Sequence, residues 1–169
     1  MFELKSSYQL YILNIIRNNN FTYFEIPIGC GKSNIIMNYS EILSNKKFGI
    51  LSPSIIFNNY LRCGKLNNVN HINLFNFFKI DINNYDVIIV ESVLLKKTHL
   101  LKLINFVNSG KKIILLDVSF YDKINTIEYL KNFNMSINIF SIDKLKYIDM
   151  MYNRTIKIKK LKDKLIVNK

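Results

Sequence analysis

The sequence predicts an α/β fold in which a mostly parallel sheet lies between two layers of helices. Short apolar segments rich in β-branched and aromatic residues alternate with longer segments of helical period along the chain. Two of the short segments, 87–90 and 112–116, are nearly uninterrupted apolar runs, which is typical of strands buried on both faces of a parallel sheet. Because strand-like and helix-like segments alternate, parallel strands joined by helices are the expected architecture.

Length and composition predict one domain. The chain has 169 residues, of which 49% are hydrophobic and 21% are charged, and this is enough apolar material for a full core. We therefore expect a single domain over 1–169. No apolar run reaches the length of a membrane span, and residues 1–7 lack the apolar core of a signal peptide. The expected location is intracellular and not at a membrane, with cytoplasm, nucleus and viral factory all left open.

The chain is strongly basic. Its formal net charge is +12 and its pI is near 9.6. The stretch 141–169 contains nine basic and three acidic residues, so half of the excess lies there. A basic surface predicts a polyanionic partner such as DNA or RNA. The alternative is that the charge serves solubility, because Asn, Ile and Lys are all abundant, as in proteins of AT-rich genomes, including those of viruses.

The expected elements follow from apolar period and from chain breakers. In the first half they are a helix at 4–17, a strand around 22–24, a helix at 33–45, a strand at 48–52, a short helix at 55–61 and a strand at 69–72. In the second half they are a strand at 87–90, a helix at 94–107 that ends at Gly110, a strand at 112–119, a helix at 121–133 and a strand at 137–142. Residues 144–151 are expected to be helical and 155–160 to form an edge strand.

The segment 24–33, FEIPIGCGKS, predicts a phosphate-binding loop between a strand and a helix. Glycines let backbone N–H groups approach phosphate oxygens, and the following helix presents its N-terminus to the anion. Lys32 is expected to reach the β- and γ-phosphates, and the Ser33 hydroxyl to hold Mg²⁺. The match to G-x-x-x-x-G-K-[ST] is incomplete because Ile26 occupies the first glycine position, and an ordinary glycine turn is the alternative. The nucleotide-binding residues expected in this segment are Pro27, Ile28, Gly29, Cys30, Gly31, Lys32 and Ser33.

A carboxylate follows the apolar run 87–90. Glu91 stands at the end of this expected strand, where parallel strands deliver side chains to the active edge of an α/β sheet. In phosphate-loop enzymes a carboxylate at such a position holds Mg²⁺ directly or through water. The alternative is a core strand that simply ends on a solvated glutamate.

In this order the motifs resemble those of the N-terminal RecA-like domain of superfamily 2 helicases and translocases. EIPIGCGKS resembles motif I of that family. The other segments with a counterpart are Tyr8-Gln9 (the Q-type motif), Leu51-Ser-Pro-Ser (motif Ia), residues 86–94 (motif II) and residues 116–120 (motif III). The resemblance covers nearly the whole chain. It implies a phosphate-loop NTPase fold that binds ATP and Mg²⁺ and contacts DNA or RNA.

The resemblance also implies roles that the residues alone do not. Gln9 would read the adenine base. Ser52 and Ser54 would contact the nucleic-acid backbone. Asp117 and Ser119 would couple hydrolysis to movement along the strand.

The departures from the family pattern concern catalysis. Motif II normally carries Asp-Glu, whereas here Glu91 takes the metal-holding position and Ser92 takes the position of the catalytic glutamate. A serine hydroxyl is a poor general base near neutral pH without a partner. The catalytic set is therefore Lys32, Glu91 and Ser92, with hydrolysis expected to be weak. A second RecA-like domain, which supplies an arginine finger, is expected to come from a partner chain.

Two other functions stay open at the level of sequence. A nucleoside or nucleotide kinase also begins with a phosphate loop, but it relies on lid arginines, and this chain has only Arg17, Arg62 and Arg154. A non-catalytic helicase-like fold that binds protein or nucleic acid is favoured by Ser92. The intact segment from Gly31 to Ser33 argues against a complete loss of nucleotide binding.

Overall fold

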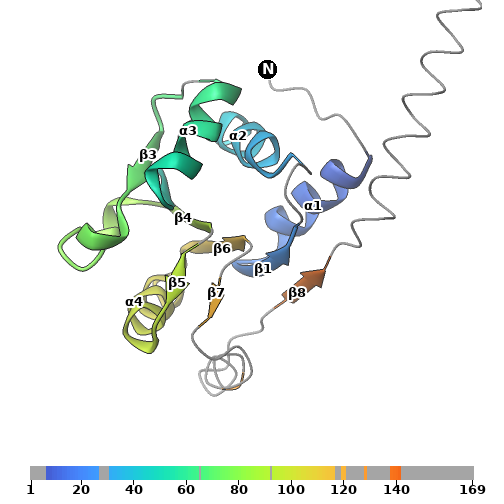
Figure 1. The fold of residues 1–169 in the computed structure, drawn as a ribbon. Coiled ribbons are helices and arrows are strands. Elements are labelled where there is room, and N and C mark those ends of the chain that lie inside the picture. Colours follow the sequence, from blue (N-terminus) through green and yellow to red (C-terminus); the bar gives the residue numbers. More distant parts are fainter. Residues whose placement is uncertain are drawn as a thin grey trace, which may run out of the picture.

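The computed structural model describes residues 7–26, 31–64, 66–91, 93–116, 119–120, 128 and 138–141 (Figure 1). Except for residue 128, the helix expected at 121–133 lies outside the described residues. The segments expected at 144–151 and 155–160 lie outside them entirely.

Six strands form one sheet, and every neighbouring pair in it is parallel. The order across the sheet is β3-β2-β4-β6-β1-β8. The strands are β1 (Phe21–Glu25), β2 (Phe48–Leu51), β3 (Val69–Ile72), β4 (Val87–Glu91), β6 (Lys112–Leu116) and β8 (Asn138–Ser141). Two short strands, β5 (Leu94–Leu95) and β7 (Ser119–Phe120), pair in parallel beside it. The α/β class and the parallel sheet that the sequence predicts are confirmed.

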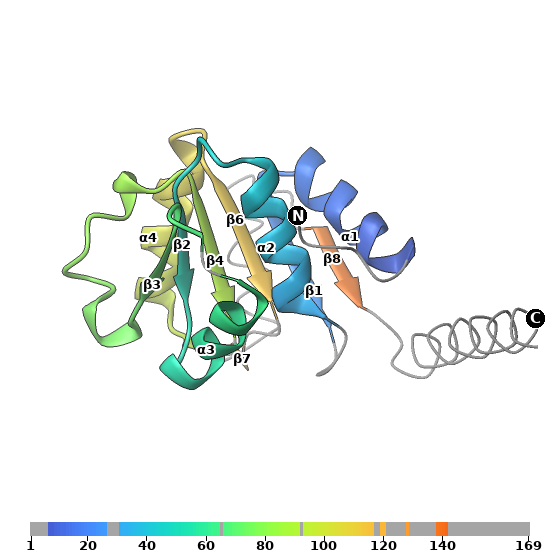
Figure 2. The same ribbon diagram turned by 90° about the horizontal axis from the view of Figure 1, so that it is seen from above.

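Helices cover both faces of the sheet. They are α1 (Ser7–Asn18), α2 (Lys32–Ile42), α3 (Ser54–Cys63) and α4 (Lys97–Asn108), with two 3-10 turns, η1 (Leu74–Asn76) and η2 (Ile82–Asn84). Figure 1 shows α1, α2 and α3 on one face and α4 on the other, and Figure 2 shows the strands side by side behind α2. The described residues therefore form the three layers expected from the sequence.

The two helix layers bury alternate residues of the same strands, as the period of a β-strand requires. Toward α1, α2 and α3 lie Phe24, Phe48, Ile50, Val87, Ile89, Ile114 and Leu116. Toward α4 lie Phe21, Tyr23, Leu51, Ile72, Ile88, Val90, Ile113 and Leu115. Complete burial of one such side chain contributes about 1.5–3 kcal/mol. Strand β4 is buried along its whole length, which explains its continuous apolar sequence.

The helix expected at 94–107 is wrong at its start. Leu94 and Leu95 are instead strand residues, paired with Ser119 and Phe120. Helix α4 begins at Lys97, and the Nδ1 of His99 accepts a hydrogen bond from the Lys96 N–H at 3.0 Å. Burial, reinforced by the nearby charge of Lys96, lowers the pKa of His99, which favours the neutral ring that this acceptor role needs.

The carboxyl end of α4 matches the prediction. The helix ends at Asn108, and Gly110 follows with a left-handed φ of 81° while its N–H donates to the Val107 carbonyl at 2.9 Å. Strand β6 then starts two residues later. Because all six strands of the large sheet are parallel, their carboxyl ends share one edge, and the helix that follows β1 begins there.

Candidate functional site

Lys32 and Ser33 form the first turn of α2, directly after the carboxyl end of β1. Gly31 precedes them in a left-handed conformation, with φ 76° and ψ 28°, and its carbonyl accepts the Ile35 N–H at 3.1 Å. The Lys32 Nζ donates to the carbonyl of Ile26, the residue that follows β1, at 2.9 Å. The lysine charge therefore lies at the end of β1, beside a helix N-terminus, which is where an anion is best stabilised.

Gln9 packs against the same turn from α1. The side chain is buried, and a Cβ placed on Gly31 would lie 2.3 Å from the Gln9 Nε2. Position 31 therefore requires glycine for two reasons, its positive φ and the space that the Gln9 amide already occupies. The order of motifs predicted Gln9 near the loop, and the structure brings the two together.

Glu91 ends β4 at the same edge of the sheet. Its side chain is buried, and one of its oxygens, Oε2, accepts a hydrogen bond from the Tyr60 hydroxyl of α3. Tyr60 is itself fully buried. A buried carboxylate needs such donors, because an ionised group taken out of water without partners is strongly disfavoured.

Tyr60 belongs to a column of rings that links the ends of β4 and β2. It stacks on Phe57, with ring centroids 6.3 Å apart, and Phe57 stacks on His71 of β3 at 4.5 Å. The His71 Nε2 donates in turn to the Ser52 carbonyl at 2.8 Å. Tyr60 was not singled out from the sequence, because nothing in its helical spacing distinguishes it from a core residue.

The strand register places Glu91 level with the end of β1. Glu91 is level with Leu116 of β6, and Leu116 is level with Phe24 of β1. One strand therefore separates the loop strand from the carboxylate strand, and two strand spacings amount to about 9.5 Å.

The residues expected to contact nucleic acid lie in different environments. Ser52 follows β2 and is buried, and its hydroxyl has no hydrogen-bond partner among the described residues. Ser54 is the exposed first residue of α3. The backbone of Ser119 belongs to β7. The other expected site residues, Pro27, Ile28, Gly29, Cys30, Ser92 and Asp117, lie outside the described residues.

The described side chains fit Mg²⁺ with a nucleotide better than they fit a metal held by protein alone. Within the described ranges no group of three or more His, Cys, Asp or Glu residues comes together. Mg²⁺ keeps several waters and usually takes only one or two protein oxygens plus phosphate oxygens. Ser33 and Glu91 at one edge satisfy that pattern. On the phosphate side, the described residues provide the N-terminus of α2 with Lys32 in its first turn.

These features define the class of site: a strand, loop and helix arrangement suited to an anion, with a buried carboxylate one strand away, at the carboxyl edge of a parallel sheet. No protein-family model and no curated protein sequence matches the chain. Among the described helices, none has the length and apolar character that crossing a bilayer requires.

Proposed function

We propose that the chain is an ATP-binding domain of the RecA-like, superfamily 2 helicase type that contacts DNA or RNA. Hydrolysis by it is weak or depends on a second RecA-like domain supplied by a partner. One observation carries the proposal: the Lys32 ammonium and the buried Glu91 carboxylate lie at the same edge of the sheet with one strand between them.

The two arginines that the structure describes disfavour the kinase, while Arg154 lies outside the described residues. Arg17 lies in the last turn of α1, and its carbonyl accepts the Lys112 Nζ at the amino edge of the sheet, far from Lys32. Arg62 lies in the last turn of α3, a helix that starts at the carboxyl edge and leads away from it. Neither arginine is placed to clamp a transferring phosphoryl group.

Each residue of the site has a chemical role in the proposal. Lys32 exchanges the Ile26 carbonyl for phosphate oxygens, a stronger, charge-assisted partner. Ser33 and Glu91 provide the two protein oxygens for Mg²⁺, which when bound with ATP neutralises the phosphates. Tyr60 holds the Glu91 carboxylate in place. With Ser92 where a glutamate is usual, no carboxylate base is positioned by the motif to activate water.

The test is equilibrium binding of a fluorescent ATP analogue with Mg²⁺. Lys32→Ala is expected to abolish measurable binding, because it removes the phosphate's charge partner. The matched control is Lys47→Ala, which removes an exposed lysine that precedes β2 at the opposite edge and should bind as the wild type does. Unchanged affinity in Lys32→Ala would overturn the assignment.

A second candidate, a non-catalytic binding domain, is favoured by Ser92. Turnover measured in parallel, with and without single-stranded nucleic acid, separates the two. Nucleotide binding with little turnover fits a domain that awaits a partner. No nucleotide binding at all fits the non-catalytic alternative.

A further inference from the structure

The segment between β3 and β4 presents two phenylalanine rings to solvent. Phe75 is 91% exposed and Phe78 is 54% exposed, whereas Phe77 between them is completely buried. Fully exposed aromatic rings forgo a large gain from burial, and neighbouring exposed apolar side chains commonly mark a binding surface.

The backbone of this segment is fixed by hydrogen bonds. It starts in η1, where the Phe75 N–H donates to the Asn73 Oδ1 at 2.9 Å. Lys102 of α4 then donates to the carbonyls of Phe77 and Ile80, each at 2.7 Å. The two exposed rings are therefore presented by an ordered turn, which reduces the entropy lost when a ligand binds.

The Phe78 ring already takes part in a stack. The His99 ring of α4 lies nearly parallel to it, with centroids 4.9 Å apart and an interplanar angle of 24°. The buried Phe77 ring contacts it edge-on at 5.6 Å. Phe78 is thus supported by the protein from α4 and from its own turn, while about half of its surface stays open.

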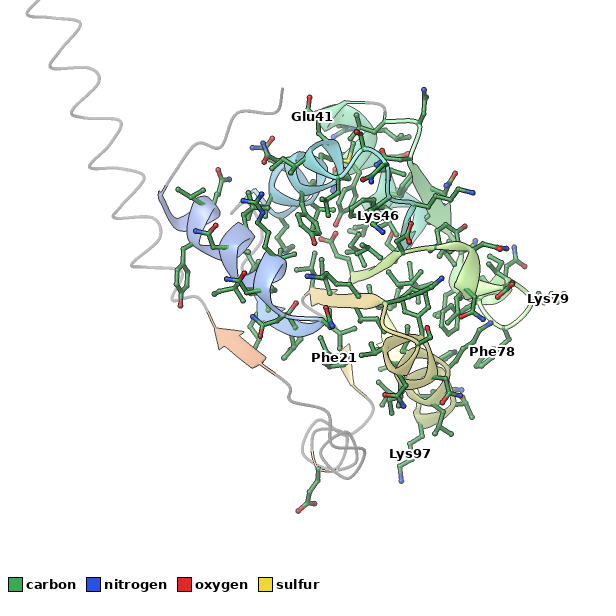
Figure 3. The ribbon with its side chains drawn as sticks, turned by 180° about the vertical axis from the view of Figure 1, so that it is seen from behind. Phe21, Glu41, Lys46, Phe78, Lys79 and Lys97 are labelled. Atoms are coloured by element: carbon green, nitrogen blue, oxygen red, sulfur yellow. The ribbon has the colours of Figure 1, made fainter. Side chains whose placement is uncertain are left out.

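Exposed lysines lie near the Phe78 ring. Lys79 follows Phe78 directly, and Lys96, whose charge acts on the stacked His99, is exposed just before α4. Figure 3 shows Lys79 and Lys97 pointing outward from the body of the protein. The nearby exposed acid, Asp81, is engaged by the Asn83 N–H at 3.0 Å. Lysines therefore outnumber acids around the aromatic surface.

We propose that Phe75 and Phe78 are a stacking platform for the bases of single-stranded nucleic acid, with Lys79 and Lys96 attracting its phosphates. Every base has a π-face that can stack on an aromatic ring, and cationic side chains beside the rings attract the backbone. Duplex bases are already stacked inside the helix and cannot use such a platform. The turn follows the carboxyl end of β3, at the same edge as Lys32 and Glu91. The inference rests on the proposed function for its class of partner, but its test needs no ATP.

The test is fluorescence anisotropy of a labelled oligothymidylate, measured without nucleotide. Phe75→Ala and Phe75→Leu are each expected to weaken binding about tenfold, because stacking on one base is lost. Phe75→Trp should keep or raise the affinity. Ile42→Ala, which truncates a 45% exposed apolar side chain at the end of α2, at the opposite edge of the sheet, is the matched control and should bind normally. Lys79→Gln should reduce the slope of log affinity against log salt by about one.

Three results would overturn the platform. They are a wild-type chain that binds no oligothymidylate, a Phe75→Ala variant that binds it as the wild type does, and a Phe75→Leu variant that retains full affinity. The last would indicate a general apolar contact such as a protein partner makes. Loss of the ATP-analogue signal in Lys32→Ala is measured separately. If the wild-type chain binds no ATP but still binds oligothymidylate in a way that depends on Phe75, the proposed ATP-binding function is wrong and the stacking platform is supported.

Discussion

Lysines at both edges of the sheet donate to backbone carbonyls, but they differ in which end of a helix lies beside them. At the amino edge, Lys112 donates to the carbonyls of Ile16 and Arg17 and so caps the carboxyl end of α1. Lys111 beside it also donates to backbone carbonyls. At the carboxyl edge, Lys32 has the Ile26 carbonyl as a partner but stands at a helix N-terminus, where an anion would be favoured.

This difference shows why the net charge of +12 overstates the charge available to a ligand. Lys102, Lys111 and Lys112 each bind backbone carbonyls of neighbouring elements, so their charge stabilises the fold. If the comparison is right, changes at the amino edge should alter stability alone, and changes at the carboxyl edge should alter nucleotide binding.

The largest effect is expected at the carboxyl edge, from Gly31→Ala. The new Cβ would collide with the Gln9 amide and occupy a positive φ, so the free energy of unfolding should fall by about 2–3 kcal/mol. Nucleotide binding should be lost with it. Urea denaturation measures the first and the ATP-analogue titration the second.

Gly110→Ala is the matched control for that change. Gly110 has a similar φ of 81°, but no atom lies within 4 Å of the added Cβ, so only the backbone strain of about 1 kcal/mol applies. Equal losses of stability in the two variants would show that contact with Gln9 contributes nothing.

The next effect is expected at the amino edge, from Lys112→Met. The change keeps the length of the side chain but leaves the carbonyls at the end of α1 without their donor, which should cost about 1–2 kcal/mol of stability. The folded variant should bind the ATP analogue as the wild type does. If Lys112→Met folds but binds the nucleotide poorly, the amino edge is not limited to a role in stability.

A smaller effect is expected from Tyr60→Phe. The ring keeps its packing, but Glu91 loses a hydrogen-bond donor worth about 1 kcal/mol, so Mg²⁺-dependent nucleotide affinity should fall about fivefold. Tyr39→Phe, at a buried tyrosine near the amino edge, is the control and should leave that affinity unchanged. If Tyr60→Phe binds the nucleotide as tightly as Tyr39→Phe does, the Tyr60 hydroxyl does not contribute to nucleotide binding.

The smallest effect concerns pH. Burial lowers the pKa of Lys112 below its ordinary value of 10.5, so the unfolded chain binds the proton more tightly than the folded chain does. Through this group, stability should rise as the pH increases from the folded pKa toward about 10.5. The stability difference between wild type and Lys112→Met should therefore grow over that range. A difference that stays constant with pH would contradict the burial effect.

The sequence predicted the parts of the site that depend on local order. The apolar run before Glu91 is recognisable because a strand buried on both faces is composed mostly of apolar residues. The position of Lys32 after a strand and before a helix follows from the glycines around it. Gln9 was predicted from the order of motifs, and its contact with Gly31 agrees with that placement.

The parts that were missed depend on residues distant in the sequence. Leu94 and Leu95 have helical spacing with α4, but pairing with Ser119 and Phe120 makes them a strand. The hydrogen bond from Tyr60 to Glu91 joins α3 to β4, and the sequence pattern of α3 does not predict it. The burial of Ser52 depends on the elements that pack around the end of β2.

The place of β1 in the sheet has a consequence for the order in which the chain folds. Its two neighbours, β6 and β8, come late in the sequence, while β2 and β3 are neighbours in the sheet that a single short helix connects. Closing the long loops to β6 and β8 costs entropy before any contact is gained, which slows folding. During synthesis, β1 leaves the ribosome well before either neighbour exists. It can pair with β6 only after 112–116 have been made and with β8 only after 138–141, so the strand that leads to Lys32 gains both of its neighbours late.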